Sequence, residues 1–224
     1  MTRWRKRIGE HKLVELLQYT VDLAVGNKHI ARRELTKVNV DTTVQEKNIT
    51  FPTDSKLLYK AIVKLVEAAK VRGIALRQSY LRVGKRAAIM VGRYAHAKQF
   101  KRMRKQLRRL KTYVGRLIRD ITRKAPQPDD ALKTLLNQCQ KLRDQQRNDK
   151  NKIYSMHEID VQCISKGKAH KRYEFGQKVS VATTNRSNWF VGALLCSGNP
   201  YDGHTLDAAL VQVQSITGTP LTDV

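Results

Sequence analysis

Acidic residues are scarce in this chain, which has 19 Asp and Glu against 44 Lys and Arg in 224 residues. The formal net charge is +25, and the sequence pI is near 10.3. A chain with so much charge of one sign repels itself unless it meets a polyanion. The composition therefore favours a nucleic-acid partner, and the length allows one large domain or two small ones.

Long apolar runs and cysteine pairs are also missing. No apolar stretch approaches the roughly 18 residues needed to span a bilayer, and the opening MTRWRKRIGEHK has no apolar signal-peptide core. We therefore expect no membrane partner and a cytoplasmic location. Cys139, Cys163 and Cys196 show neither a CxxC spacing nor a histidine at zinc-ligand spacing. This pattern predicts reduced, mostly buried thiols.

The most informative residue is Asp41, in the run KVNVDTTVQEKNITFPTDS. Val38, Val40 and Val44 alternate with polar residues, and this period of two predicts a strand. A carboxylate in mid-strand needs compensation, because burying an unpaired charge is expensive. A divalent cation is one candidate, and a basic side chain or a solvent-facing strand edge is the simpler alternative.

Helical periodicity dominates the first two thirds of the chain. In the segment 9–27, apolar residues at helical spacing from Leu13 to Ala24 predict a helix that closes on Gly26, a residue suited to the left-handed C-terminal position. After Phe51-Pro52, the sequence predicts a helix capped within 53–55 and ended by Gly73. Further helices are expected over 75–95, 101–124 and 131–149.

The helix expected over 101–124 is basic and amphipathic, with eleven Lys and Arg and the single acid Asp120. Like charges four residues apart destabilise a helix unless a partner screens them. A solvated basic face is the alternative, but we expect this helix to contact the DNA backbone. The residues expected to do so are Arg102, Arg104, Lys105, Arg108, Arg109 and Lys111.

The period changes to two after residue 151. Strands are expected over 173–181 and 189–197, joined by the turn TTNRSN. The second of these strands is apolar on both faces, as suits an interior position in a sheet. A helix over 204–216 follows, so the order is strand, helical block, hairpin and helix.

That order resembles the RNase H-like core of DDE transposases, interrupted after its first strand by a helical insertion. The resemblance of the local sequence is closer than that of the order of elements. Four blocks of this sequence look like successive blocks of bacterial insertion-sequence transposases of family five: RWRKRIGE, VNVDTTVQEKNITFPTDSKLLYKAI, RNDKNKIYSMHEIDVQCISKGKAHKRYEFGQKVSVA and NPYDGHTLDAAL. The resemblance covers almost the whole chain.

The resemblance implies that Asp41 is the first carboxylate of a DDE triad and a ligand of Mg²⁺ or Mn²⁺. The second aspartate and the glutamate are expected beyond Val224, and the family carries further sequence ahead of RWRKRIGE. The implied function is strand cleavage and strand transfer at insertion-sequence ends, with this chain an inactive fragment. The alternative is a non-enzymatic basic DNA-binding protein or inhibitor derived from a transposase.

The implied fold is α/β (α+β), a partial RNase H-like core with a helical insertion after the first strand. We expect a basic N-terminal helical segment at 1–36, an incomplete catalytic core at 37–52 plus 155–224, and a helical insertion at 53–154. The expected partner is double-stranded DNA, both element ends and target, near the bacterial nucleoid. A homo-oligomer or an assembly with the intact transposase is also implied.

Other carboxylates in the chain have simpler roles. We expect Asp202 to serve as a turn or helix cap rather than as a metal ligand. Glu158 and Asp160 lie beside His157 in the run HEID, which lacks the HExxH spacing of a zinc-binding helix. Surface or hairpin-stabilising roles are expected for them.

Overall fold

A computed structural model describes residues 8–165 and 172–222. The chain forms two compact units, one from 1–47 with 163–224 and the other from 48–162. The first unit holds a sheet and the second is helical. The basic cluster at 3–7 and Asp223 lie outside the described residues. The mixed α/β class expected from the sequence is confirmed.

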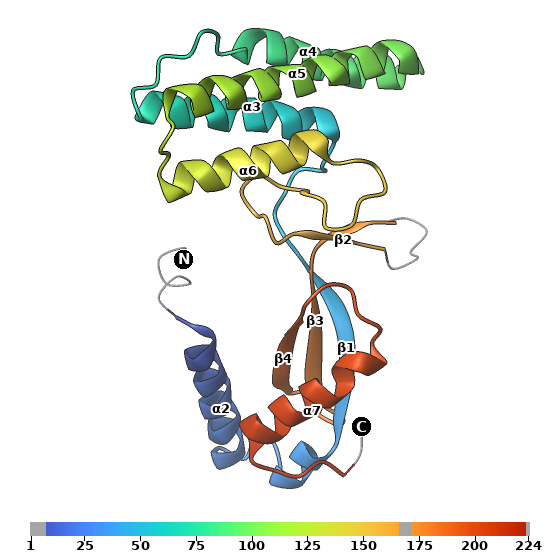
Figure 1. Ribbon diagram of the computed structural model, residues 1–224. Helices are drawn as coiled ribbons and strands as arrows, with labels where there is room; N and C mark the ends of the chain where they lie inside the picture. Colours follow the sequence, from blue (N-terminus) through green and yellow to red (C-terminus); the bar gives the residue numbers. More distant parts are fainter. Residues whose placement is uncertain (1–7, 166–171, 223–224) are drawn as a thin grey trace. The chain divides into compact units, whose positions relative to one another are not determined.

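The first unit is built on a four-stranded antiparallel sheet (Figure 1). Its strands are β1 (Val38–Glu46), β2 (Gln162–Ile164), β3 (Glu174–Thr184) and β4 (Phe190–Cys196). The long strand β3 is interior. It pairs with β1 along the whole length of β1, from Val38 opposite Thr184 to Glu46 opposite Gly176.

Strand β4 pairs with β3 from Lys178 opposite Cys196 to Thr183 opposite Phe190, with a bulge beside Ala182. The expectation that the strand over 189–197 is interior is wrong for the described residues, because β4 has no second partner strand there. Some of its apolar residues are buried and others are exposed. Val191 is buried, whereas Phe190 and Leu195 are 42% and 58% exposed.

One face of the sheet is covered by α2 (Glu10–Gly26) and α7 (Gly203–Thr217), with the short 3₁₀ helix η1 (Arg32–Thr36) leading into β1. Helix α7 lies along the sheet in Figure 1. The core between these elements consists of buried apolar residues, mainly Val21, Ala24, Leu35, Val38, Ala182, Val191, Val213 and Ile216. The opposite face, which carries Asp41 and Thr43, is exposed.

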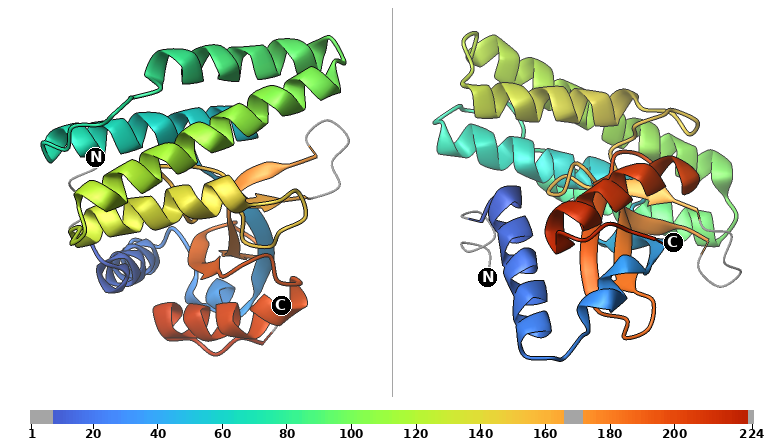
Figure 2. Two further views of the ribbon diagram at one scale, coloured as in Figure 1. Left: turned by 45° about the horizontal axis from the view of Figure 1, so that its top comes forward. Right: turned by 90° about the horizontal axis from the view of Figure 1, so that it is seen from below.

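The second unit packs four helices side by side (Figure 2). They are α3 (Asp54–Val71), α4 (Leu81–His96), α5 (Phe100–Lys124) and α6 (Asp130–Asp144). Helix α5 contacts the other three, and its apolar stripe is buried among them. The largest fully buried side chains of this core are Leu58, Ile62, Leu65, Leu110, Leu117, Ile121, Leu132 and Leu142.

Helix boundaries follow the expected signals in part. The Thr53 hydroxyl caps α3 by accepting the Lys56 N–H, and Gly73 follows α3 in the left-handed region at φ 66°. Helix α4 begins at Leu81 rather than at residue 75, because the intervening segment is held as a loop against α5. Gly26 is the last residue of α2, and Lys28 takes the left-handed conformation instead.

Among the described residues, no helix is both long enough and apolar enough to cross a bilayer.

The close pairing of β1 with β3 leaves no room for a side chain at Gly176. A Cβ there would lie 2.1 Å from the carbonyl oxygen of Gln45. We expect Gly176→Ala to lower the free energy of unfolding by about 1–3 kcal/mol, as overpacking does. The shift can be measured by denaturant titration of the half-buried Trp189 fluorescence. Gly26→Ala is the matched control, because no atom lies within 4 Å of its Cβ position. It should leave stability unchanged or raise it, and equal losses in both variants would contradict the packing explanation.

Helix α6 begins at a charged cap. Asp129 accepts the Leu132 N–H at 2.7 Å and receives two hydrogen bonds of 2.8 Å from the Arg72 guanidinium. The bonds from Arg72, followed by the helix N–H groups, lower the pKa of Asp129 to about 2.

A carboxyl whose pKa is lowered on folding contributes stability above its unfolded pKa and loses that contribution as the pH falls through the folded pKa. We therefore expect the Asp129 contribution to disappear between about pH 4 and pH 2. Asp129→Asn retains a good helix cap but removes the charge. Acid titration of helicity should be less steep in this variant over that window. Identical curves for Asp129→Asn and the unaltered chain would contradict the prediction.

Candidate functional site

Asp41 lies in the middle of β1, opposite Val181 on β3, and its side chain is exposed. Its Oδ1 accepts the backbone N–H of Thr42 at 2.8 Å. The sequence left open a cation, a basic partner or a solvent-facing position as compensation for this charge. The structure shows a solvent-facing position on the face of the sheet opposite α7.

Asp202 lies at the start of α7 and fixes that helix to the sheet. Its Oδ1 is 2.5 Å from Nζ of Lys178 and accepts a 2.8 Å hydrogen bond from the Thr42 hydroxyl. The Lys178 ammonium also donates to the Pro200 carbonyl at 2.6 Å. Asp202 makes no side-chain cap bond. Because Thr42 points to the opposite face of β1 from Asp41, Asp202 supports the fold on the other side of the sheet from Asp41.

The run HEID forms a turn organised by Ser155. The buried Ser155 hydroxyl bonds the His157 ring at 2.9 Å and accepts the Glu158 N–H at 3.2 Å. The side chains of Glu158 and Asp160 are exposed. This arrangement is the surface role that we expected for them.

A magnesium site needs several hard oxygen ligands in octahedral geometry. The described residues contain no group of three or more His, Cys, Asp or Glu placed to hold a metal ion. Asp41 supplies one carboxylate, and the described residues of β1 and β3 that share its face of the sheet include no second acid. The described residues therefore do not form a magnesium site by themselves.

The three cysteines are free thiols, and Cys139 and Cys196 are buried. Burial raises the pKa of the Cys139 thiol to about 12, against a small opposing effect of Lys64. A thiol with so high a pKa is a poor nucleophile and metal ligand at neutral pH.

The excess positive charge lies mainly in the helical unit. Residues 48–162 contain 28 Lys and Arg against 9 Asp and Glu, a net charge of +19. The remaining 16 Lys and Arg and 10 Asp and Glu give the other unit +6. Between Glu67 and Asp120 the sequence has 17 basic residues and no acid. We therefore expect the polyanion partner to bind this unit.

Helix α5 concentrates this charge on one face. Exposed residues spaced three or four apart follow the helix from end to end: Lys101, Lys105, Arg108, Thr112, Arg116, Arg119 and Arg123. We call this set the α5 basic face. A helix of 25 residues is about 37 Å long, which matches about 11 base pairs of duplex DNA.

Five of the six residues expected to contact DNA are exposed: Arg102, Arg104, Lys105, Arg108 and Arg109. Their hydrogen bonds are local. Arg102 donates to Gln99, Arg109 to Gln106 and Arg104 to the Phe100 carbonyl. Since a guanidinium has five donors, each of these arginines can still bind a phosphate.

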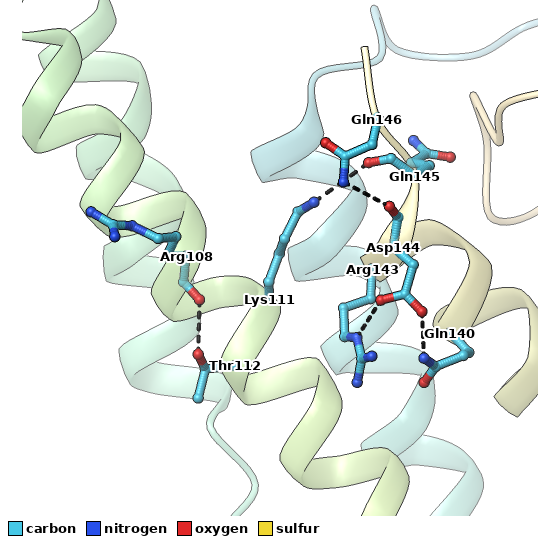
Figure 3. A network of polar contacts seen from close by, with 8 residues as sticks. All are labelled: Arg108, Lys111, Thr112, Gln140, Arg143, Asp144, Gln145 and Gln146. Carbon is cyan, nitrogen blue, oxygen red and sulfur yellow. Dashed lines mark hydrogen bonds and ion pairs between the residues drawn. The ribbon is translucent and has the colours of Figure 1, made fainter. Parts of the chain in front are cut away.

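Lys111 is different, because it lies beside the end of α6 (Figure 3). Its ammonium donates to the Gln145 carbonyl at 3.4 Å, and its side chain is half-buried. Asp144 accepts from Arg143 at 2.8 Å and from Gln140 at 2.5 Å, and the Arg143 bond is the main cause of its lowered pKa. Lys111 thus connects α5 to the end of α6 and does not belong to the α5 basic face.

Four arginines that sequence reasoning missed surround a hollow near the C-terminal end of α5. These are Arg77, Arg116, Arg119 and Arg123. The last three could have been found by extending the three-or-four spacing beyond Lys111. Arg77 lies in the loop before α4, and no sequence spacing relates it to α5.

Comparison with known proteins gives one informative similarity. A protein of Rhizobium meliloti named "Uncharacterized protein ORF8 in nfe locus" is 55% identical to this chain over 100 residues. The alignment covers 45% of this chain and 48% of that protein, so the chain spans about half the length of this relative. No family model matches the chain. No solved structure matches it.

The exposed arginines of α5 allow a direct test of DNA contact. Each phosphate contact adds about 0.9 to the slope of log affinity against log salt. The double variant Arg104→Glu/Arg108→Glu should lower that slope by about 1.8 if both residues contact phosphates. Fluorescence anisotropy with a labelled duplex at several salt concentrations measures it.

The matched control is Arg32→Glu/Arg33→Glu, which changes the net charge equally at two exposed positions of η1. It should leave the slope unchanged. Equal slopes for the α5 variant and the unaltered chain would remove this helix from the interface.

Proposed function

We propose that this chain is a DNA-binding part of a DDE-type transposase, with Asp41 as one carboxylate of the metal site that such an enzyme requires. The helical unit binds the DNA backbone through α5. The sheet unit corresponds to the first strands of an RNase H-like core. Element ends and target DNA are the proposed partners.

The position of Asp41 is the observation that carries the proposal. It is an exposed carboxylate in the middle of the first strand, and its neighbour strand β3 is followed by the hairpin to β4 and by α7. A carboxylate needed only for folding would be expected to have a fixed partner. Among the described residues, Asp41 accepts one hydrogen bond, and it comes from the backbone of the adjacent Thr42.

The exposed face around Asp41 also supports the proposal. Metal ions that act on a phosphodiester must be reached by the DNA strand, so their ligands lie on an accessible surface. Asp41 and Thr43 lie on the face of the sheet that α2 and α7 leave exposed. Mg²⁺ or Mn²⁺ would need further oxygen ligands beside Asp41, which the described residues do not supply.

The second candidate is a non-enzymatic DNA-binding protein derived from a transposase. Two observations favour it: no metal-holding group that includes Asp41 occurs among the described residues, and the helical unit carries +19 of the total net charge of +25. Such a protein would bind element DNA and interfere with assemblies of the intact enzyme. In that case Asp41 would be dispensable for every activity of the chain.

Strand cleavage by the purified chain tests whether its metal site is complete. Because one carboxylate cannot fix two metal ions, we expect no Mg²⁺- or Mn²⁺-dependent cleavage of supercoiled or linear DNA by the 224-residue chain. Duplex binding should persist in Asp41→Ala. Metal-dependent cleavage that disappears in Asp41→Ala would show a complete site and contradict this expectation.

The metal role of Asp41 needs a separate measurement in the intact enzyme. In a complementation assay with the full transposase, Asp41→Ala should abolish excision of a marked element, whereas Asp202→Asn should act only through stability. Full excision by the Asp41→Ala enzyme would remove Asp41 from the proposed metal site.

A further inference from the structure

A hollow of about 500 Å³ lies in the helical unit, between α5 and the loop that precedes α4. Its charged lining consists of Arg77, Arg116, Arg119, Arg123 and Asp120, and Gln78, Tyr80 and Leu117 complete it. This volume falls in the usual range of ligand pockets, about 300–1,000 Å³. The hollow is therefore large enough for a nucleotide.

The loop that forms one wall is fixed to α5 at two points. Asp120 accepts the backbone N–H of Arg77 at 2.9 Å, and the Lys124 ammonium donates to the carbonyl of Ala75. Lys124 also pairs with Asp120 at 3.2 Å. Asp120 and Lys124 thus act as a clamp, and the clamp brings Arg77 to the arginines of α5.

Asp120 remains charged in this position. The hydrogen bond from the Arg77 N–H lowers its pKa most strongly, and burial opposes that shift. Because Lys124 pairs with Asp120, the carboxylate is already neutralised by the clamp. The charge of Arg123 also lowers the pKa of Asp120, so this one carboxylate offsets only part of the charge of the four arginines around the hollow.

Those four guanidinium groups are poorly satisfied by the protein. All four residues are exposed, and Arg116 donates a long bond of 3.5 Å to the Tyr80 hydroxyl. The side chains of Arg77, Arg119 and Arg123 make no hydrogen bond or ion pair with another residue that the structure describes. Arg119 also shares the space beside Gly115 with the like-charged Arg143. An anion in the hollow would relieve the repulsion among the four guanidinium groups that line it.

An aromatic wall completes the pocket. Tyr80 has a left-handed backbone at φ 56° and stacks on Tyr113, with ring centroids 4.7 Å apart and planes 16° apart. Helix α4 begins directly after Tyr80, with no side-chain cap and no acid in its first turn. A helix start of this kind favours negative charge nearby.

We infer that this hollow, the arginine pocket, binds a backbone phosphate of a nucleic-acid strand together with its sugar. Guanidinium groups bind phosphate oxygens through paired hydrogen bonds, and Tyr80 offers a flat surface to the sugar or base. The assignment of this phosphate to DNA rests on the proposed function, whereas the binding of a phosphate in the pocket does not. The pocket would fix the register of the strand along the α5 basic face without reading its sequence.

Thymidine 3′,5′-bisphosphate is a suitable probe, because it carries two phosphates and one sugar and cannot span α5. Isothermal titration should show one saturable site on the 224-residue chain. Arg119→Gln/Arg123→Gln should weaken this binding about tenfold or more, since hydrogen bonds to charged groups are lost. The matched control, Arg86→Gln/Arg93→Gln, removes two exposed charges from α4 and should change the affinity less than twofold, about the scatter of distant surface changes.

Competition identifies the source of the phosphate. The bisphosphate should displace a labelled duplex from the unaltered chain and should displace it less effectively from Arg119→Gln/Arg123→Gln. Saturable bisphosphate binding without any displacement of duplex would overturn the assignment to a nucleic-acid strand. Circular dichroism of each variant confirms that the helices are intact.

Two other results would overturn the inference that the pocket binds phosphate. One is the absence of saturable bisphosphate binding while duplex still binds, which would leave the proposed DNA binding in place. The other is an equal loss of bisphosphate affinity in the pocket variant and in the α4 control. Duplex binding that fails while the bisphosphate binds at the pocket would contradict the proposed function and the strand assignment together.

Discussion

Burial of the apolar stripe of α5 is the interaction on which the helical unit depends. This helix carries eleven Lys and Arg and the single acid Asp120, so its own charges oppose its formation. Leu110, Val114, Leu117 and Ile121 offset that repulsion because they are almost fully buried against α3, α4 and α6. The apolar contacts hold the basic residues in place without neutralising them.

Asp120 is one of the few acidic residues of the helical unit, and its role is structural. Among the described residues, its ion pair is with Lys124, which is outside the α5 basic face. It also binds the loop backbone at Arg77, and Lys124 binds the same loop at Ala75. One buried carboxylate therefore builds the wall of the arginine pocket while leaving its guanidinium groups available to a ligand.

The sheet unit separates structural from exposed acids in a similar way. Asp202 is engaged by Lys178 and Thr42 on the side of α7, so its charge supports the fold. Asp41, one residue away from Thr42, is on the other face and is exposed. Alternation along a single strand is enough to give two neighbouring residues opposite tasks. In each unit, apolar packing on one side of a helix or strand thus fixes the charged groups that the same element exposes to solvent on its other side.

Patterns within single segments were read correctly. The sequence predicted α2, a cap of α3 within 53–55, the basic helix α5, the hairpin of β3 and β4, and α7. It also predicted that Asp41 lies in a strand. It failed at Gly26, at the start of α4 and at the position of β4. At the start of α4 the local preference was overridden by the contact of Asp120 with the preceding loop. Strand β4 has no second partner strand among the described residues.

The sequence by itself determined the period of each element, the sign and location of the charge, and the residues able to face solvent, because these properties are set within a few turns of chain. Only the tertiary structure decided that Lys111 joins α6, that Asp202 pairs with Lys178, and that Arg77 meets Arg116, Arg119 and Arg123. Such meetings depend on the path of the chain between the residues. No spacing or composition encodes that path directly.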